Sequence, residues 1–411
     1  MQEGLLEKAG ILMSQQRYDD AEKLLGEVIS ADPTNDYVLY LLAEVNLQKE
    51  NLNKAEEYID SAIALYPQES RYFFLKARLY LFREKKADAE KYIRQAIGMD
   101  PYNADYFSLL AHILLIKKDY DAALDTANEA LALDANHLLG LNIRSTALLK
   151  LNRKEESFNT IAEALHEDPN DAYTHSNYGW GLLEKGDVKK SLVHFTEALR
   201  NDPNSMHAKA GMIEALKARF MVYRWFLQYS FWMSNMAAKY QWAFIAGFYF
   251  GTKALQRLAD SSPTLRPFLL PLIILLFVFA FSTWIITPLG NLFLRLNKYG
   301  KHLLDKEEKI TSTLTGVCVL LSVLSGITYL LTANEPWLVA AFFTFTMLIP
   351  VSRLFAKPSG VFISYVSAMF VVGAIATVTA FTTGEIDTLA TVYLFGLLAF
   401  QFLANYFVIR D

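Results

Sequence analysis

The sequence is poor in cysteine and has no recognisable export signal. Cys318 is the single cysteine among 411 residues, so no disulfide can form within the chain. This usage suits a reducing compartment. The opening stretch, "MQEGLLEKAGILMSQQRYDDAEK", lacks a basic segment followed by an apolar run and a small-residue cleavage site. We therefore expect the first half to be made, and to stay, in the cytoplasm.

Motifs for chemistry are also missing. The seven histidines show no spacing typical of metal ligands, and there is no glycine-rich GxxxxGK loop for a phosphate. The acidic stretch "LLDKEEK" at 303–309 is best interpreted as a solvated helix end. A net charge of −4 gives no reason to expect nucleic-acid binding. We expect no enzyme activity, no cofactor and no metal.

What the sequence does contain is a pattern that returns every 34 residues in its first half. Proline recurs at Pro33, Pro67, Pro101, Pro169 and Pro203, with Ala135 in the missing place. Three further registers carry small residues. They read Ala21, Ala55, Ala89, Ala123, Ser157 and Ser191; Val28, Ala62, Ala96, Ala130, Ala164 and Ala198; and Ala9, Ala43, Ala77, Ala111, Ser145 and Gly179. Small residues let paired helices approach closely, and proline ends a helix.

This pattern resembles the tetratricopeptide repeat, a 34-residue helix–turn–helix unit. The resemblance covers about residues 2–205, with Tyr18 and Tyr120 in the usual aromatic place. The family's early Trp is replaced, in four units, by Leu5, Leu39, Phe73 and Phe107. The resemblance implies an all-α solenoid of about six repeats, in which stacked units form a concave groove. The apolar stripe within 206–222 predicts a capping helix, so the first domain is 1–222.

The resemblance also implies which side chains line the groove: positions five and nine of each first helix. These are Tyr40 and Glu44, Phe74 and Arg78, Ser108 and His112, Asn142 and Thr146, and Ser176 and Trp180. We expect a protein partner to bind there as an extended peptide or a helix. The other interpretation is that each is an ordinary solvated position. Leu6 and Gly10 stand where chaperone-binding relatives carry residues that hold a C-terminal carboxylate.

The second half, 240–411, is predicted to be a transmembrane domain. A helix needs about 20 apolar residues to cross a bilayer. Five runs qualify, and the third of them, at 336–353, does so only narrowly. With a sixth segment described below, the predicted spans are 240–258, 267–290, 311–333, 336–353, 360–382 and 388–409.

Loop charges predict the orientation of these spans. The 295–309 segment carries five Lys or Arg residues, Arg353 and Lys357 follow the third run, and Arg410 follows the last. By the positive-inside rule, these loops and the C-terminus face the cytoplasm. Five spans would then place the repeats outside. If 240–258 is a sixth span, the repeats lie in the cytoplasm, although Arg257 and Arg266 would then fall in an outside loop.

The stretch 223–251 holds twelve aromatic residues and two charges. Residues 223–239 are predicted to form an aromatic helix at the membrane interface, anchored by Trp225 and Trp232, with Trp242 at the start of the next span. The alternative is that Trp225 and Trp232 pack on the end of the solenoid. Gly247 and Gly251 share one helix face, which indicates close packing either within the chain or in a homodimer.

The layout resembles that of bacterial inner-membrane proteins with tetratricopeptide repeats and a multi-span C-terminal domain. We therefore expect a membrane-anchored scaffold that recruits a protein partner, embedded in the lipid bilayer and in contact with another integral membrane protein or a second copy. The alternative is a transport or lipid-handling protein regulated by its repeats. Lys253 is the one charge predicted at membrane depth, which disfavours ion-coupled transport but leaves a lipid cavity open.

Overall fold

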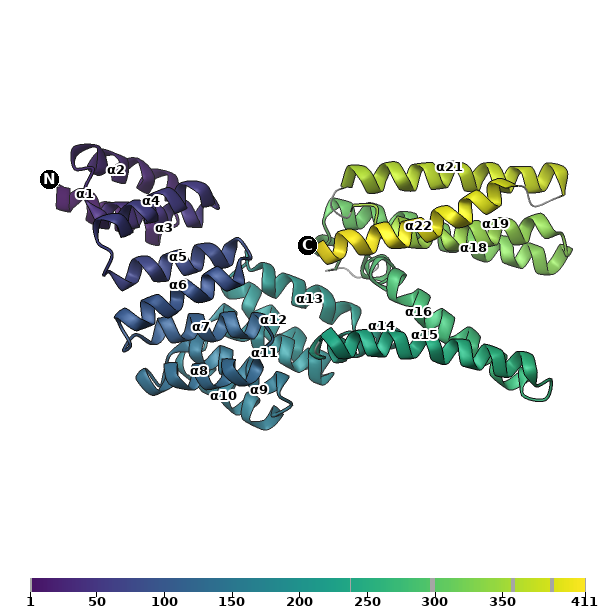
Figure 1. Cartoon of the computed structure of the whole chain (residues 1–411), viewed down its shortest axis with the longest axis horizontal. Helices are drawn as coiled ribbons and strands as arrows, with labels where there is room; N and C mark the ends of the chain where they lie inside the picture. The colour runs from purple at the N-terminus through teal and green to yellow at the C-terminus, as the bar shows by residue number, and fades with distance from the viewer. Residues whose placement is uncertain (1, 237, 296–299, 356–358, 385–387, 411) are drawn as a thin grey trace. The chain divides into compact units, whose positions relative to one another are not determined.

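The computed structural model describes residues 2–236, 238–295, 300–355, 359–384 and 388–410, and every regular element in these ranges is a helix (Figure 1). The chain forms two compact units. One comprises Met1–Gly181 with Thr196–Ser205, and the other comprises Leu182–Phe195 with Met206–Asp411. The expected boundary at 222 therefore falls inside the second unit, because the capping helix packs there.

Helix pairs recur along the first half with the predicted 34-residue period. The first helices are α1 (Gln2–Ser14), α3 (Asp36–Gln48), α5 (Ser70–Phe82), α7 (Ala104–Ile116), α9 (Leu138–Lys150), α11 (Ala172–Lys185) and the capping helix α13 (Met206–Lys217). The second helices are α2 (Tyr18–Ala31), α4 (Leu52–Leu65), α6 (Lys86–Met99), α8 (Tyr120–Leu133), α10 (Lys154–Glu167) and α12 (Val188–Asn201). The predicted all-α repeat architecture is confirmed.

Small residues stand where the two helices of a unit meet. Ala43 and Ala55, one from each helix of the same unit, are each 1% exposed. In a later unit serines occupy both places, and they satisfy each other: Ser145 Oγ donates to the Ser157 carbonyl at 3.0 Å, and Ser157 Oγ donates to the Ser145 carbonyl at 2.8 Å. The buried hydroxyls therefore avoid the cost of unpaired polar groups.

Two kinds of turn also repeat with the same period. Between units, an aspartate side chain accepts a hydrogen bond from the amide two residues later, as Asp32 does from Thr34 and Asp168 from Asn170. Such Asx turns favour the reversal of the chain. Within units, one residue takes a left-handed backbone conformation. These residues are Gln16, Glu50, Glu84, Lys118, Asn152 and Gly186. Only the last of the six is a glycine, the residue that adopts this conformation without strain.

The turn conformation predicts a stabilising substitution. Glu84 is exposed with φ of 59°, so Glu84→Gly relieves left-handed strain while adding freedom to the unfolded chain. We expect a net gain of about 0.5 kcal/mol in the free energy of unfolding. Denaturant unfolding of the full chain measures it. The matched control, Gly186→Ala at φ of 92°, should lower the same quantity by about 1 kcal/mol. A loss of stability on Glu84→Gly would contradict the interpretation.

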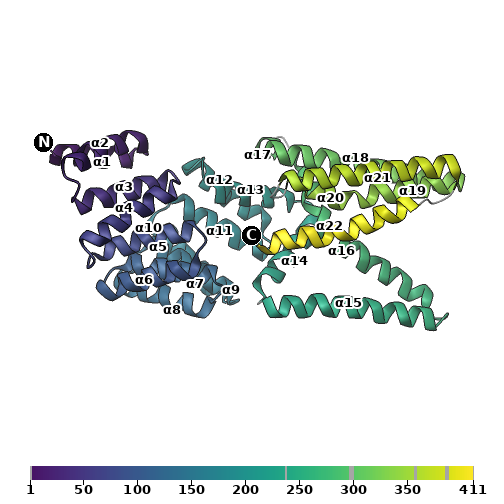
Figure 2. The ribbon, with the colours of Figure 1, turned by 45° about the horizontal axis from the view of Figure 1, so that its top comes forward.

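The second unit continues with longer helices. They are α14 (Met221–Asn235), α15 (Ala238–Ser261), α16 (Arg266–Arg295), α17 (Gly300–Leu303), α18 (Lys306–Thr332), α19 (Glu335–Thr346), α20 (Leu348–Ser352), α21 (Ser359–Thr383) and α22 (Thr388–Arg410). Helices α18, α19, α21 and α22 run side by side in both views (Figures 1 and 2). Phe343 and Phe400 lie in the apolar core that these helices share.

Two breaks in these helices follow from proline. Helix α16 bends by 71° between Arg266–Phe281 and Ile285–Arg295, and Pro288 lies four residues after the bend. Helix α19 ends at Thr346, four residues before Pro350 in α20. In both cases the proline has no amide hydrogen for the carbonyl four residues earlier, and its ring crowds that turn.

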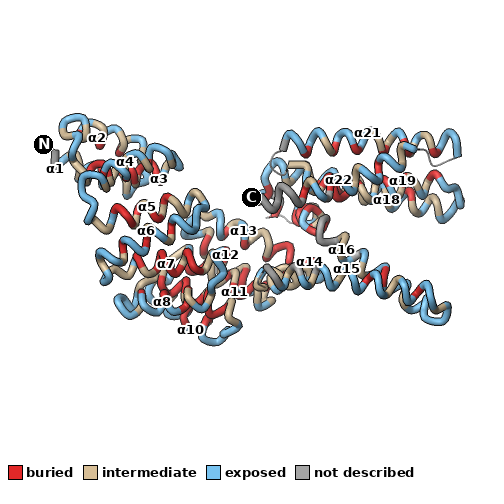
Figure 3. The backbone as a smooth tube through the Cα atoms, viewed as in Figure 1, coloured by how far each residue is buried: buried red, intermediate tan, exposed pale blue. Residues whose placement is uncertain are grey.

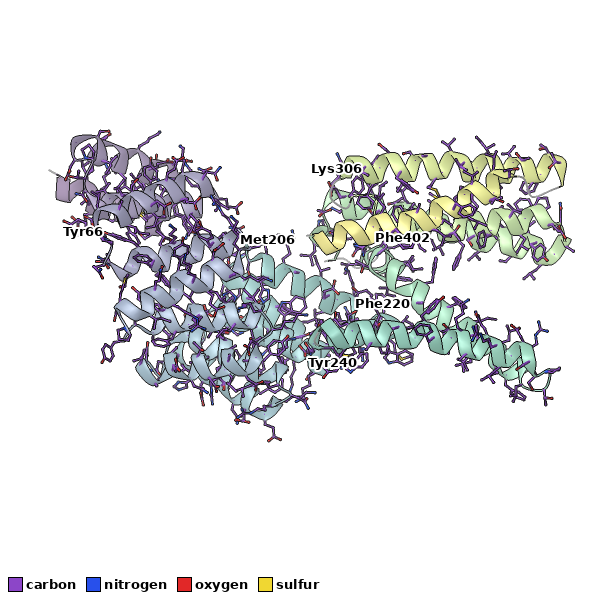
Figure 4. All side chains as sticks on the ribbon, viewed as in Figure 1. Tyr66, Met206, Phe220, Tyr240, Lys306 and Phe402 are labelled. Atoms are coloured by element: carbon purple, nitrogen blue, oxygen red, sulfur yellow. The ribbon has the colours of Figure 1, made fainter. Side chains whose placement is uncertain are left out.

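Three described helices are long and apolar enough to cross a membrane: 306–332, 335–352 and 360–383. The bent α16 makes a fourth if its two arms count as one span, and the described apolar part of α22, Thr388–Ala404, is shorter. Helix α15, predicted to be the first span, is not among them. Apolar side chains on these helices are widely exposed, for example Leu331 at 81% on α18 and Phe402 at 77% on α22 (Figures 3 and 4).

A buried lysine fixes the capping helix to α16 inside the second unit. Lys217 is 1% exposed, and its Nζ lies 3.0 Å from Glu214 Oε1 and 5.6 Å from the centre of the Tyr223 ring. Tyr223 donates its hydroxyl to the same carboxylate at 2.7 Å. Burial and the adjacent Glu214 raise the pKa of Tyr223. Gly290 of α16 permits this contact, because an added Cβ would lie 2.7 Å from the Tyr223 ring.

Candidate functional site

The predicted groove residues lie on successive first helices of the solenoid. Tyr40 and Glu44 are on α3, Phe74 and Arg78 on α5, His112 on α7, Asn142 on α9 and Trp180 on α11. All are half-buried except Asn142, which is 1% exposed. The 34-residue register therefore brings them to equivalent places in consecutive units, as the sequence predicts. Their role in binding stays a prediction.

The two charged members of the set bind each other. Arg78 donates two hydrogen bonds to Glu44, at 2.8 Å and 3.1 Å, and its guanidinium carbon lies 5.8 Å from the centre of the Phe74 ring. A fork of two parallel bonds holds both side chains in one geometry. Because position nine of one unit bonds position nine of the next, the pair also ties α3 to α5.

Aromatic rings form a ladder beside this ion pair. Tyr37 stacks on Tyr40 at 6.1 Å between ring centres, Tyr40 stacks on Tyr72 at 5.6 Å, and Phe74 lies 5.1 Å from Tyr106. The two buried tyrosines are tied to the preceding unit through their hydroxyls. The Tyr72 hydroxyl donates to Asp36, and the Tyr106 hydroxyl lies 3.0 Å from Ser70 Oγ. The ladder is consequently rigid before any partner arrives.

Asn142 is buried and hydrogen-bonded within the solenoid. Its amide nitrogen donates to the Leu138 carbonyl at 2.9 Å and to Thr174 Oγ1 at 2.7 Å, while its oxygen accepts from Asn177 at 2.9 Å. All of these partners belong to the solenoid, so the side chain is not available to a ligand in this structure. At this position the polar residue joins α9 to α11, and its role in binding stays a prediction.

The neighbouring units replace aromatic contacts with a histidine bridge. His137 Nδ1 accepts from the Gly140 amide at 3.1 Å, so the Ser108 hydroxyl, 3.0 Å away, also donates to it. The proton then resides on Nε2, which donates to Asp105 at 3.0 Å. Ser108 is fully buried. This part of the surface is polar and already hydrogen-bonded, whereas the part on α3 and α5 is aromatic.

Position two of each first helix is a feature that the sequence prediction missed. Tyr37 is 43% exposed and Tyr173 is 41% exposed, and Arg71 lies 6.0 Å from the Tyr37 ring centre. Position two precedes position five by three residues, so both share one helix face. Tyr37, Arg71 and Tyr173 all fall on the 34-residue register of the repeats, and this register was a signal that could have identified them.

The remaining predicted residues lie in the second unit. Trp225 and Trp232 of α14 are 65% and 50% exposed, and Trp232 meets Phe244 edge to face at 5.3 Å. The side chain of Trp242 lies outside the described residues. At Gly247 and Gly251 an added Cβ would meet no atom within 4 Å. Among the described residues nothing packs against either glycine, and close packing within the chain or in a homodimer stays a prediction.

Comparison with known families agrees with the repeat geometry. Two family models described as "Tetratricopeptide repeat" match residues 12–79 and 74–137. Residues 12–137 are tetratricopeptide repeats. The helix pairs on either side continue the same period in the structure. Such repeats are protein-interaction modules that bind peptide or protein partners, and no catalytic domain is indicated.

Solved structures with a similar fold were also found. The APC/C heterotetramer Cut9–Hcn1 is 16% identical, with 53% of this chain and 43% of that one covered and a TM-score of 0.47. PilW, a type IV pilus biogenesis factor, is 14% identical over 51% of this chain and 97% of its own, with a TM-score of 0.44. YrrB, described as having an unusual peptide-binding site, is 20% identical over 45% and 95%, with a TM-score of 0.33. No curated protein matches the sequence.

The Glu44–Arg78 pair yields a prediction for a double-mutant cycle. Both side chains are partly buried, at 16% and 27% exposed, and their two hydrogen bonds are well aligned. We expect a coupling of about 1 kcal/mol in the free energy of unfolding between Glu44→Gln and Arg78→Met. The exposed pair Arg153–Glu156 is the control and should couple more weakly. Equal coupling in the two pairs would mean that burial adds nothing at this place.

His112 predicts an acid sensitivity of the repeats. Burial lowers the pKa of its imidazole below the ordinary value of 6.5. The unfolded chain then binds a proton more readily, so this residue reduces stability as pH falls from 6.5 through the lower folded pKa. His112→Gln should lose less stability than the natural chain over that window, measured by denaturant unfolding at several pH values. An unchanged pH dependence would contradict it.

Proposed function

We propose that this chain is a membrane-anchored scaffold, whose tetratricopeptide repeats recruit a protein partner to the cytoplasmic face of a bacterial inner membrane. One observation carries the proposal: the same chain contains tetratricopeptide repeats at 12–137 and helices that are long and apolar enough to cross a membrane. The repeats supply a protein-binding surface. The apolar helices supply an anchor.

The exposure of apolar side chains supports insertion of the second unit. Leu330 and Leu331 at one end of α18 are 80% and 81% exposed, and Leu320 and Leu324 further along are 59% and 51% exposed. Contiguous apolar surface of this kind is unfavourable in water and favourable against lipid tails. Helix α18 therefore fits a span with lipid on much of its circumference.

An even number of spans keeps the repeats and the C-terminus on the same side. Helices α16, α18, α19 with α20, and α21 make four, and α15 with α22 would make six. Helix α15 is the weak member, and a five-span arrangement that includes α22 alone would export the repeats. The basic segment at 295–309 supports a cytoplasmic position for that loop. The side chains of Lys298, Lys357 and Arg410 lie outside the described residues.

Labelling of engineered cysteines tests the orientation. In a Cys318→Ser background, Glu57→Cys on the exposed face of α4 should resist a membrane-impermeant maleimide in intact cells and react after lysis. Asn334→Cys, between α18 and α19, should react in intact cells because that loop is expected outside. Reaction at Glu57→Cys from outside would place the repeats beyond the membrane and overturn the proposal.

The aromatic ladder provides the test of recruitment. Tyr37→Ala removes an exposed ring without breaking an ion pair, and it should reduce the amount of a protein that cross-links to the full chain in native membranes. The matched control is Tyr66→Ala, on the connection between α4 and α5 (Figure 4), where the ring is 58% exposed. The same loss in both variants, or in neither, would contradict partner binding on the ladder.

A second candidate function, lipid handling, is favoured by two apolar cavities in the second unit. One, of about 620 Å³, lies between α18, α19, α20 and α21 and is lined by Cys318 and Phe370. The other, of about 370 Å³, lies between α19, α21 and α22 and is lined by Phe343 and Tyr393. Cavities of this size in a bundle of apolar helices suit acyl chains.

A further inference from the structure

A polar cavity of about 300 Å³ lies at the N-terminal end of α18, the end marked by Lys306 in Figure 4. It is formed by α16, by the first turns of α18 and by the residues that follow α20. Three carboxylates line it, from Asp305, Glu307 and Glu308, and one guanidinium, from Arg353. The formal charge of the lining is therefore negative, and the cavity favours a positively charged group.

One buried acceptor in this cavity has no hydrogen-bond partner. Asn291 of α16 is 4% exposed, lines the cavity, and its Oδ1 bonds to nothing in the described structure. A buried polar atom without a partner is energetically unfavourable. An oxygen kept in this state at the wall of a negatively charged cavity is suited to accept a hydrogen bond from a cationic ligand.

The polar cavity and the 620 Å³ apolar cavity lie along one face of α18. Glu307 and Thr311 line the first, and Leu314, Cys318 and Leu321 line the second. These five residues are spaced by four, three, four and three, so they form a single stripe along the helix. The stripe is polar at the end of the helix and apolar further in.

The segment after α19 also contributes residues to both the polar and the apolar cavity. Val351 and Leu354 line the apolar cavity, whereas Ser352 and Arg353, between them in sequence, line the polar one. The two cavities are therefore neighbours on opposite sides of the same short segment. A ligand that fits both has a compact polar end and a long apolar end.

The chemistry of the polar end narrows the ligand class. Among the described residues, no group of three or more His, Cys, Asp or Glu side chains could hold a metal ion, which disfavours a divalent cation. An ammonium group matches the carboxylates and Asn291 Oδ1 and donates three hydrogen bonds. The Arg353 guanidinium matches a phosphate. An ammonium and a phosphate joined to apolar chains make an amine-bearing zwitterionic phospholipid.

We propose that α16, α18 and the segment after α20 form a binding site for a phospholipid of this class, phosphatidylethanolamine. The headgroup occupies the 300 Å³ cavity and one acyl chain occupies the 620 Å³ cavity. Asn291 and Glu307 accept hydrogen bonds from the ammonium, and Arg353 binds the phosphate. The site deepens the lipid-handling function and rests on the membrane insertion of α18, but not on partner recruitment.

Binding to the purified full chain in detergent micelles tests the site. Phosphatidylethanolamine with a fluorescent acyl chain should bind at least about tenfold more tightly than the matching phosphatidylglycerol, because the negative cavity repels an anionic lipid. Asn291→Leu and Glu307→Gln should each weaken phosphatidylethanolamine by about tenfold, the order expected for one charged hydrogen bond. Thr313→Ala, on the same helix but outside the cavity, should bind normally.

Two further measurements separate the outcomes. Glycerophosphoethanolamine, which has no acyl chains, should not displace the lipid at equal concentration; displacement would mean a site for a free headgroup and overturn the proposal. Lipid bound in the apolar cavity should slow the reaction of Cys318 with N-ethylmaleimide. Equal binding of the two lipids, or normal binding by both Asn291→Leu and Glu307→Gln, overturns the site.

The failure of the site is distinguishable from failure of the proposed function. If Cys318 in native membranes reacts with a charged, membrane-impermeant maleimide, α18 is not inserted. That result would overturn both the proposed membrane anchor and the proposed lipid site. If Cys318 stays unreactive to that reagent while the micelle assay shows no lipid preference, the lipid site alone is overturned.

Discussion

The solenoid depends on how closely the two helices of each unit can approach. Two side chains per unit, such as Ala77 and Ala89, are fully buried at the crossing, and nothing larger than a serine stands there from Ala43 to Ser157. Where both places hold serine, the hydroxyls bond across the crossing, so a polar pair keeps the same spacing. Overpacking a crossing typically costs about 1–3 kcal/mol. The constant spacing then lets the same turns recur every 34 residues.

Because the units are equivalent, a polar residue in one unit finds its partner in the next. Arg78 bonds Glu44 at a separation of 34 residues, and the Tyr72 and Tyr106 hydroxyls reach Asp36 and Ser70 at a separation of 36. Most of the polar side chains named at the candidate groove are thus already hydrogen-bonded within the solenoid. If a partner binds the aromatic area on α3 and α5 as proposed, the rings would lose little conformational entropy, because contacts between units already hold them.

The period, the helix pairs and the crossings could be predicted from the sequence, because they rest on local spacing and on side-chain size. The burial of Asn142 could not be predicted, because it depends on hydrogen bonds to Thr174 and Asn177 in the next unit. The boundary at 222 stays a prediction, although the capping helix groups with the later helices in the structure. Lys217 looks like a surface residue in sequence, and only the contact with Tyr223 and the glycine of α16 places it in the second unit.

The apolar helices of the second unit could be predicted from composition, whereas their geometry was less predictable. Long apolar runs identify α18 and α21, and proline four residues after each break accounts for the bend near Pro288 and for the interruption between α19 and α20 near Pro350. The polar cavity and the larger apolar cavity beside it could not be predicted from the sequence. They form only where residues from helices such as α16, α18 and α20 meet in the folded chain. Asn291 gives no sign of its unpaired oxygen in a sequence where asparagine is common at surfaces.

The bend in α16 has a consequence for its depth in a bilayer. Its first arm, Arg266–Phe281, has sixteen residues, which corresponds to about 24 Å of helix. The hydrocarbon layer of an ordinary bilayer is about 30 Å thick. The second arm, Ile285–Arg295, has eleven residues and turns away by 71°, so it adds about 5 Å along the direction of the first arm. In a bilayer, the two arms together would reach about as far as the hydrocarbon layer is thick, and the second arm would lie at a shallow angle close to one lipid headgroup layer.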